Sequence, residues 1–527
     1  MAFARHSLVK KFLFMKILTL LFTCLLALPL QSQLSAQDQK YWIFFADKDL
    51  TGYDYRQHLS AEAIANRQLL GLPLVQATDA PVNAMYLQAL RQKGVQPQVV
   101  SHWLNAATAW LAPQQLQQVK ALPFVAGWQK CQGKIRPARH GEKPGAFPGM
   151  ALSQMNVGML AEQGLTGEGV NVGVIDAGFY NAHKTRHLNH LFEQKKVLGY
   201  LDFVNPRRET FFEERETFSD WHGTNVLKMI TGMLKDKEQL GLATGASFYL
   251  ARTDHGVNET RSEEDNWVRA LEWMDSLGVR LVNTSLGYST GFDNPEEDYA
   301  PGQMDGQTSV VTRAAQIAAR EKGMLLVVSA GNEGNLRSWQ VVSAPADAQD
   351  VFSVGATDVN GLKAGYSSTG PEELQWLKPN VSCYSPNGTS FSAPVITGLA
   401  ACLLQKKPDA TASELFLAIE QSASLYPLGN NYIGQGIPDA SKALQILAES
   451  EAGEQRWASI KAGKNRKVKI SLKKAGGKVI VFHKTSEKHV KEQDIFRLEE
   501  PEIHLVRPGG VVRSTVLANG ELFEVYW

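Results

Sequence analysis

Three segments of this 527-residue chain carry side chains that could together perform nucleophilic chemistry. Asp176 ends a short apolar run, His222 opens a stretch with helical spacing, and Ser390 lies among small residues just before the apolar run Val395–Gln405. A serine hydroxyl is a weak nucleophile that needs an adjacent base, and a histidine base needs an acid to hold its tautomer. The order Asp, His, Ser therefore predicts an activated serine.

A fourth segment supplies a group that could stabilise negative charge. Asn332 follows a buried run and lies between Gly331 and Gly334, and its side-chain amide could donate to an oxyanion. Taken singly, each residue has an ordinary explanation as a turn residue, a surface histidine or a helix cap. The combination favours catalysis.

The elements that must position these residues form a predicted parallel sheet within residues 149–446. Near-continuous apolar runs alternate there with helical stretches, which is typical of a sheet covered on both faces. The expected strands are 170–175, 248–251, 279–283, 324–329 and 351–355, and the expected helices are 222–234, 263–277 and 312–322. Active sites of such sheets lie at the carboxyl ends of the strands, which is where Asp176 falls.

A smaller domain is expected on each side of this body. Residues 37–135 alternate strand and helix signals, among them the aromatic run Tyr41–Phe45, and suit a compact α+β domain. Gly, Pro and basic residues follow without periodicity, so 136–148 is interpreted as a linker. Residues 447–527 switch to a period of two, which indicates a small β domain. Asn519-Gly520 predicts a hairpin there, and Gly476-Gly477 predicts a turn between 468–472 and 479–482.

The first 36 residues have the pattern of a secretory signal. Four basic residues precede the apolar run Ile17–Leu30, and the small residue Ala36 follows. The run is short for a membrane span, although an uncleaved anchor is the alternative. The mature chain is therefore expected to be secreted, whether extracellular, periplasmic or at the cell surface.

The remaining cysteines and the charge distribution set further limits. Cys131, Cys383 and Cys402 allow at most one disulfide, whose pairing stays open. A net charge of +1 gives no case for nucleic acid as a partner, and 44% hydrophobic residues exclude a disordered chain. However, residues 456–491 hold 12 Lys and Arg against one acidic residue. That segment predicts docking on an anionic surface, such as lipopolysaccharide or the acidic body itself, unless its lysines only protect strand edges.

The motifs around the four segments resemble those of the subtilisin-like serine proteases (subtilases, peptidase family S8), in the style found in Bacteroidetes bacteria. They are VGVIDAG around Asp176, HGTNV from His222, SAGNEG around Asn332 and GTSFSAP around Ser390. The resemblance covers residues 149–446 and implies a three-layer α/β/α fold with a mostly parallel sheet. One departure is Ala177, where the family often has Ser or Thr.

The resemblance also implies roles for individual residues. Asp176 resembles the acid of the catalytic triad, His222 the base, Ser390 the nucleophile and Asn332 the oxyanion-hole donor. The substrate-binding segments it implies are Ser285-Leu286-Gly287, which resembles the strand that pairs with substrate, and Ser329-Ala330-Gly331, which resembles a wall of the S1 pocket. The expected reaction is hydrolysis of peptide bonds in proteins or peptides through an acyl-enzyme.

Residues 37–135 resemble a propeptide that assists folding and inhibits the active site, so the chain's own propeptide is an expected partner. The chemistry requires no cofactor. Many family members carry structural calcium, but no clear acidic loop marks such a site here and no metal ligand is assigned. Two rivals are a sedolisin-type acid peptidase, against which His222 argues, and a binding protein on an inactive protease scaffold.

Three other patterns are set aside. Gly287-Tyr-Ser-Thr-Gly291 matches the G-x-S-x-G motif, but Pro295 follows where that motif needs a helix. The glycines that begin at Gly164 lack dinucleotide-binding spacing. His183, His187 and His190 lack a carboxylate or cysteine that would complete a metal site, and a solvated face is expected instead.

Overall fold

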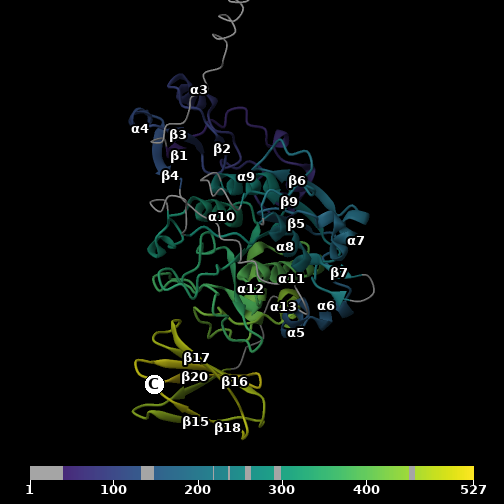
Figure 1. The fold of residues 1–527 in the computed structure, drawn as a ribbon, viewed down its shortest axis with the longest axis vertical. Helices are drawn as coiled ribbons and strands as arrows, with labels where there is room; N and C mark the ends of the chain where they lie inside the picture. The colour runs from purple at the N-terminus through teal and green to yellow at the C-terminus, as the bar shows by residue number, and fades with distance from the viewer. Residues whose placement is uncertain are drawn as a thin grey trace, which may run out of the picture.

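The structure is a computed structural model that describes residues 39–131, 147–217, 219–234, 238–255, 263–289, 298–449 and 457–527. The predicted signal sequence and all but the last two residues of the predicted linker lie outside these ranges. Within them the chain forms an N-terminal domain, a large central domain and a C-terminal β domain, which follow one another along the long axis (Figure 1). No helix in the described part of the chain is long and apolar enough to cross a membrane.

The central domain is built on a seven-stranded sheet whose strand order is β13-β12-β11-β10-β5-β9-β6. All neighbouring strands are parallel. The strands are β5 Asn171–Asp176, β6 Val197–Asp202, β9 Ser247–Arg252, β10 Leu281–Thr284, β11 Leu325–Ser329, β12 Phe352–Thr357 and β13 Val381–Tyr384. The predicted parallel sheet is confirmed.

Helices cover both faces of this sheet, because its side chains alternate between two apolar clusters. Leu281 and Val327 contact the cluster that includes α8 and α11, whereas Val282 and Val328 face the cluster of α9 and α10. The helices of the central domain are α5 Phe147–Gln154, α6 Gly158–Glu162, α7 Asn189–Glu193, α8 His222–Thr231, α9 Glu263–Ser276, α10 Val310–Arg320, α11 Ala393–Lys406, α12 Ala412–Ser422 and α13 Ala440–Glu449. The arrangement is the subtilisin-like three-layer α/β/α fold.

The N-terminal domain is a four-stranded antiparallel sheet with short helices, as its alternating signals predicted. Its strands are β1 Gln39–Phe45, β2 Val99–Ser101, β3 Ala106–Leu111 and β4 Val125–Lys130, in the order β2-β3-β1-β4. Its helices are α2 Ala61–Leu69, α3 Ala84–Gln92 and α4 Pro113–Lys120. Trp42 and Trp103 share a buried cluster with Trp267 of α9 and Ala314 of α10, so the domain is packed on these two helices (Figure 1).

The C-terminal domain contains a five-stranded sheet of order β14-β20-β19-β16-β17 and the separate pair β15-β18. Its strands are β14 Trp457–Lys461, β15 Lys467–Ser471, β16 Lys478–Lys484, β17 Val490–Arg497, β18 Glu502–Val506, β19 Arg513–Ala518 and β20 Glu521–Tyr526. Asn519 and Gly520 both have positive φ between the antiparallel strands β19 and β20, which confirms the predicted hairpin.

Several local predictions were wrong, each for a physical reason. The turn at Gly476-Gly477 does not pair its flanking strands, because β15 pairs with β18 and β16 with β17 and β19. Strands β6 and β13 were missed because they are edge strands without a long apolar run. The helix predicted over 222–234 ends at Thr231, and Met233–Leu234 (β7) instead pairs with Glu238–Gln239 (β8).

Buried side chains settle two further expectations. Cys131, Cys383 and Cys402 are all buried, and no disulfide links them. His190 is buried with its ring nitrogen Nε2 3.2 Å from the Thr231 hydroxyl, so the solvated histidine face expected at 183–190 is wrong for this residue. No group of three or more metal-ligating side chains occurs among the residues that the structure describes.

Candidate active site

The predicted acid and base are in direct contact. Asp176 is the last residue of β5 and His222 is the first residue of α8, and His222 Nδ1 lies 2.7 Å from Asp176 Oδ1. The same oxygen accepts a hydrogen bond from the Ala177 backbone N–H at 2.8 Å. Because an ionised carboxylate can only accept, Nδ1 carries the hydrogen and Nε2 is left as the basic nitrogen. In the described part of the chain, Nε2 has no hydrogen-bond partner.

Two glycines allow the acid and the base to approach. A Cβ on Gly178 would lie 2.7 Å from the Asp220 Cα, and one on Gly223 would lie 2.5 Å from the Gly178 carbonyl oxygen. Both positions are closed by backbone, which cannot give way as a flexible side chain can. The glycines of the VGVIDAG and HGTNV motifs therefore hold β5 and α8 at contact distance.

The predicted nucleophile lies in a short 3-10 turn, Thr389–Phe391, and the helix begins after it at Ala393. Ser390 is therefore displaced by three residues from the first residue of α11. The displacement also explains Pro394, which occupies the first helical turn, where a missing N–H costs nothing. Phe391 brings this turn against the base, since its ring centroid is 5.7 Å from that of His222.

Ser390 is tied to one predicted substrate-binding segment by a reciprocal pair of hydrogen bonds. The Ser390 hydroxyl donates to the Ser285 carbonyl at 3.2 Å, and the Ser285 hydroxyl donates to the Ser390 carbonyl at 3.0 Å. Behind them, buried Asn283 donates to the Ser285 hydroxyl at 3.1 Å and accepts from Thr397 of α11 at 2.9 Å. The end of β10 and the start of α11 are thereby fixed to each other.

Thr389 ties the Asn332 segment to the same turn. Its backbone N–H donates to the Asn332 side-chain oxygen at 2.8 Å, and its hydroxyl contacts the same oxygen at 3.1 Å. That hydroxyl also accepts from the Gly331 N–H and lies within hydrogen-bonding distance of the Gly331 carbonyl. Because Thr389 engages the amide oxygen of Asn332, the NH₂ group is left as the donor of this partly exposed side chain.

The two predicted substrate-binding segments follow neighbouring strands, β10 and β11, and meet the nucleophile turn from the same edge of the sheet. Ser285, Leu286, Ser329 and Ala330 are buried, and Gly331 has a φ of 111°, which favours glycine. At Gly287 a Cβ would lie 2.1 Å from the Ser343 hydroxyl oxygen. The structure thus brings every sequence-predicted site residue into one region. Asp176 and His222 contact each other on one side, and the turn with Thr389 and Ser390 contacts the Ser285 and Asn332 segments on the other.

The electrostatics of His222 involve a carboxylate that sequence reasoning missed. Burial lowers the pKa of His222, but the charge and hydrogen bond of Asp176 and the charge of Asp254 outweigh it, so the pKa is raised above its ordinary value. Asp254 is buried two residues after the end of β9. The sequence did contain a signal for Asp254, because this carboxylate follows an apolar strand of the same sheet in the way that Asp176 ends β5.

A second missed feature is a buried charge cluster behind the acid. Arg252, the last residue of β9, is fully buried; its Nε donates to the Ala177 carbonyl at 3.0 Å, and its other nitrogens contact Asp202 at 3.0 Å, Glu216 at 2.9 Å and Asp220 at 3.3 Å. Asp220 lies two residues before His222, and its carbonyl accepts the Tyr180 N–H. Arg252 therefore joins the segment after the acid to the segment before the base.

Comparisons with known proteins agree with this fold and its motifs. Residues 167–443 match the subtilase family (peptidase S8), and residues 40–143 match the peptidase S8 propeptide domain of Bacteroidota. Subtilisin E of Bacillus subtilis is 28% identical over 381 residues, which cover 70% of this chain and 88% of that protein. Subtilisin DY of Bacillus licheniformis is 30% identical over 294 residues, which cover 54% of this chain and 93% of that protein.

Among solved structures, MycP1 from Mycobacterium smegmatis matches with a TM-score of 0.43 at 22% identity, covering 59% of this chain and 89% of that chain. The family match spans more than half of the chain and contains all four motif segments. The chain therefore belongs to the subtilase family and is a serine peptidase, a hydrolase.

Proposed function

We propose that the chain is a secreted serine endopeptidase whose triad is Asp176, His222 and Ser390, and that the form with its N-terminal domain in place is latent. The observation that carries the proposal is the 2.7 Å contact between His222 and Asp176, with Ser390 held in the turn that packs on the His222 ring. His222 and Ser390 are both buried, each with 1% of its surface exposed.

In the proposed reaction, the Ser390 hydroxyl leaves the Ser285 carbonyl, gives its proton to His222 Nε2 and attacks the scissile carbonyl carbon. Asp176 holds the tautomer of His222 and stabilises the imidazolium that forms. The tetrahedral intermediate collapses to an acyl-enzyme as His222 protonates the leaving amine. Water then attacks the acyl carbon by the same route in reverse and releases the acid product.

Two donors would hold the oxyanion of this intermediate. The Asn332 amide is directed by Thr389, which occupies its oxygen and leaves its NH₂ group available. The Ser390 backbone N–H would be the second donor. Donors that are already oriented before the reaction stabilise charge without reorganisation, and one such donor is worth about 10²–10³ in kcat. The Ser285–Gly287 and Ser329–Gly331 segments would bind the substrate on either side. No cofactor enters the chemistry.

Labelling with a fluorophosphonate tests the proposal. The processed protein should be modified at Ser390, as located by mass spectrometry, and Ser390→Ala should abolish both labelling and peptide hydrolysis, lowering kcat by about 10⁴ or more. Thr397→Ser, which keeps a buried hydroxyl on α11, serves as a folded control. The chain is an inactive scaffold if the processed protein remains unlabelled although both it and the Thr397→Ser control are folded, as shown by a cooperative thermal unfolding transition.

The N-terminal domain is proposed to be the chain's own inhibitory propeptide. Its match to the Bacteroidota propeptide domain and its packing on α9 and α10 support this role. Processing between the domains should convert a poorly labelled chain into a rapidly labelled one. Secretion is supported by the pattern of residues 1–36, and amino-terminal sequencing of protein recovered outside the cytoplasm would test it.

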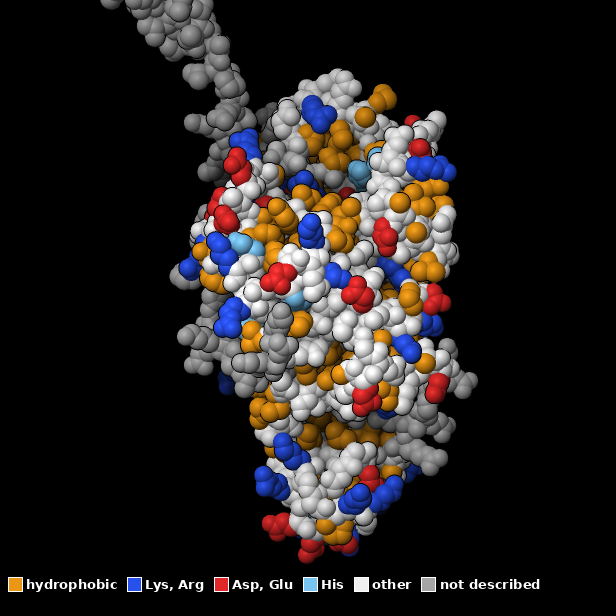
Figure 2. Space-filling model, turned by 90° about the vertical axis from the view of Figure 1, so that its right-hand side faces the viewer, with side chains coloured by type: hydrophobic (Ala, Val, Ile, Leu, Met, Phe, Trp, Pro, Cys, Tyr) orange, Lys and Arg blue, Asp and Glu red, His pale blue; other side chains and the backbone are white. Residues whose placement is uncertain are grey.

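Docking on an anionic cell surface remains a proposal for the C-terminal domain. Fewer of its basic residues are available for such docking than the charge count suggested, because some pair with glutamates. Lys484 is buried against Glu524, and Lys469 pairs with Glu502. Basic and acidic side chains are mixed at this end of the molecule (Figure 2). One group of exposed basic residues lies in and around β15: Lys461, Lys464, Arg466, Lys467, Lys473 and Lys474. Binding to lipopolysaccharide should fall with salt, and salt-independent binding would count against this role.

A further inference from the structure

Four charged side chains alternate in sign across the contact between the N-terminal domain and the central domain. Asp275 of α9 and Lys322, just beyond α10, come from the central domain, and Arg67 of α2 and Asp79 come from the N-terminal domain. Their side chains are only 9%, 0%, 3% and 4% exposed, respectively. We call these four residues the charge row.

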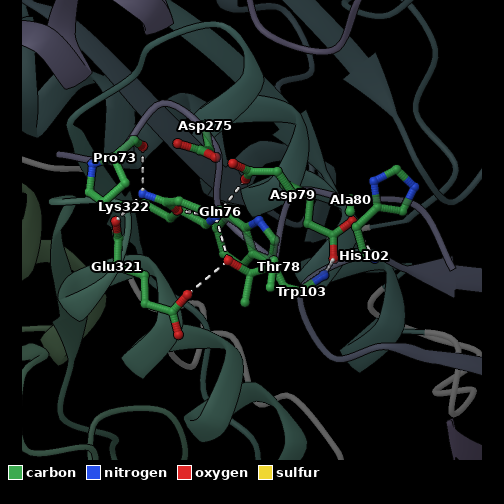
Figure 3. Close-up of polar contacts among 12 residues, drawn as sticks. Pro73, Gln76, Thr78, Asp79, Ala80, His102, Trp103, Asp275, Glu321 and Lys322 are labelled. Carbon is green, nitrogen blue, oxygen red and sulfur yellow. Dashed lines mark hydrogen bonds and ion pairs between the residues drawn. The ribbon is translucent and has the colours of Figure 1, made fainter. Parts of the chain in front are cut away.

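The side chain of Lys322 donates hydrogen bonds to three groups of the N-terminal domain. Its Nζ donates to Asp79 at 2.5 Å, to the Gln76 side-chain oxygen at 2.6 Å and to the Thr78 hydroxyl at 2.8 Å. It also lies 5.5 Å from the ring centroid of Trp103. Figure 3 shows this segment of the N-terminal domain gathered around the end of the lysine. A fully buried ammonium with three oxygen partners is well satisfied only while that segment is in place.

Asp275, at the other end of the charge row, contacts Arg67 of the N-terminal domain. Its Oδ2 accepts from Arg67 Nη2 at 2.9 Å, and Arg67 reaches Asp79 with a second, bidentate contact. Nearby, Thr78 donates to Glu321 at 2.8 Å, and Gln76 donates to the Glu321 carbonyl at 2.9 Å. The charges therefore alternate in sign in the order Asp275, Arg67, Asp79, Lys322. Each domain supplies one charge of each sign.

We propose that Lys322 and Asp275 form an anchor that retains the N-terminal domain after the chain has been cut between the domains, so that this remote contact sets how long the cleaved domain stays bound. The proposal rests on the proposed function, in which that domain is the propeptide. The partner is specified by its chemistry: it must present a carboxylate to Lys322 and a guanidinium to Asp275 in the spacing of Asp79 and Arg67.

The anchor depends on the cost of burying a charge without its partner. Removing one member of a buried, hydrogen-bonded charge pair leaves the other without compensation, and the cost falls mainly on the dissociation rate. A domain without Asp79 would bury the Lys322 ammonium against two neutral oxygens. Once the domain has left, Lys322 and Asp275 lie on the surface of α9 and α10 and are solvated, so the anchor is not needed for the stability of the processed enzyme.

The test uses the full chain with Ser390→Ala, which removes self-cleavage, and a recognition sequence for a site-specific protease inserted between residues 131 and 147. After cutting, the rate at which the N-terminal fragment leaves is followed by size-exclusion chromatography. Lys322→Met should raise that rate by about 30-fold or more. Lys406→Met, which removes an equal charge from an exposed position on α11, is the matched control and should change the rate less than twofold.

A double-mutant cycle separates the anchor from a general loss of packing. If Lys322 and Asp79 act as a pair, Asp79→Asn with Lys322→Met should raise the rate by clearly less than the product of the two single effects. Effects that simply multiply, or a Lys322→Met rate within twofold of the parent, would overturn the anchor. Lys322→Arg, which keeps the charge, covers the case in which the methionine variant fails to fold, and it should retain the fragment at least tenfold longer than Lys322→Ala.

The anchor and the protease assignment fail in different ways. The dissociation experiment uses an inactive background and needs no peptidase activity, whereas the fluorophosphonate experiment needs no N-terminal domain. In the processed enzyme, Lys322→Met should leave kcat/KM for a peptide unchanged. A processed Lys322→Met enzyme with altered kcat/KM would show that Lys322 acts on the catalytic domain itself and would contradict the anchor.

Discussion

At the scale of single residues, the environment of His222 has a consequence for pH dependence. Its pKa is raised because the charges of Asp176 and Asp254 outweigh burial. The proposed base must be neutral, so kcat/KM should fall as the pH drops through this raised pKa. Asp254→Asn removes one of the charges that raise it, and the acid limb of the pH profile should move to lower pH. An acid limb that stays in place would exclude Asp254 from the electrostatics of the base.

Asn332 allows a second prediction at this scale. Asn332→Ala removes one oriented donor, and kcat should fall by about 10²–10³ with KM nearly unchanged, because the donor meets charge that develops only in the transition state. Steady-state kinetics on a peptide substrate measure both quantities. Asn335→Ala, three residues further along the chain, is a suitable control. A loss confined to KM would mean that Asn332 binds substrate rather than the oxyanion.

At the scale of elements, Arg252 links the end of β5 to the start of α8 through Ala177 and Asp220. Arg252→Met removes a buried cation that Asp202, Glu216 and Asp220 share, and Arg208 still pairs with Asp202 and Glu216. Folding should therefore be weakened by about 3 kcal/mol, mainly through the lost partner of Asp220 and the lost contact with Ala177. In the fraction that folds, kcat should fall while KM stays near that of the parent, because the Asp176–His222 contact loses its support. Arg252→Lys should restore part of kcat. Arg252 would be merely structural if stability fell and the kcat of the folded enzyme did not.

The same scale shows what the sequence could and could not predict. Strands and helices with continuous apolar or helical patterns, such as β11 and α9, were predicted within a few residues because the pattern is local. The edge strand β6 has no such pattern. The side-chain partners of Ser390 and Arg252 lie from 32 to 105 residues away in the chain, so no spacing rule could reveal them. The motif residues were recognisable one by one, but their contacts were not.

At the scale of the whole molecule, the C-terminal domain packs on the central domain through an apolar cluster, which hydrogen bonds such as Lys363–Gln493 and Asn431–Val490 flank. Phe482, Val490 and Leu522 meet Leu425 and Ile433 of the central domain. Phe482→Ala removes the largest of these side chains, 1% exposed, and should cost about 3–5 kcal/mol in the stability of this contact. The C-terminal domain should then be released by limited proteolysis at a far lower protease concentration. Phe496→Ala, at an exposed ring on β17, should leave the digestion pattern unchanged.

The order of the segments along the chain determines when the packing on α9 and α10 can form during synthesis. A ribosome makes the N-terminal domain first, and the helices that it covers are complete by residue 320, whereas the turn with Ser390 follows some 70 residues later. Domains tend to fold as units in the order of synthesis. The N-terminal domain, as the proposed propeptide, can thus meet its surface on α9 and α10 while Ser390, the proposed nucleophile, is still untranslated.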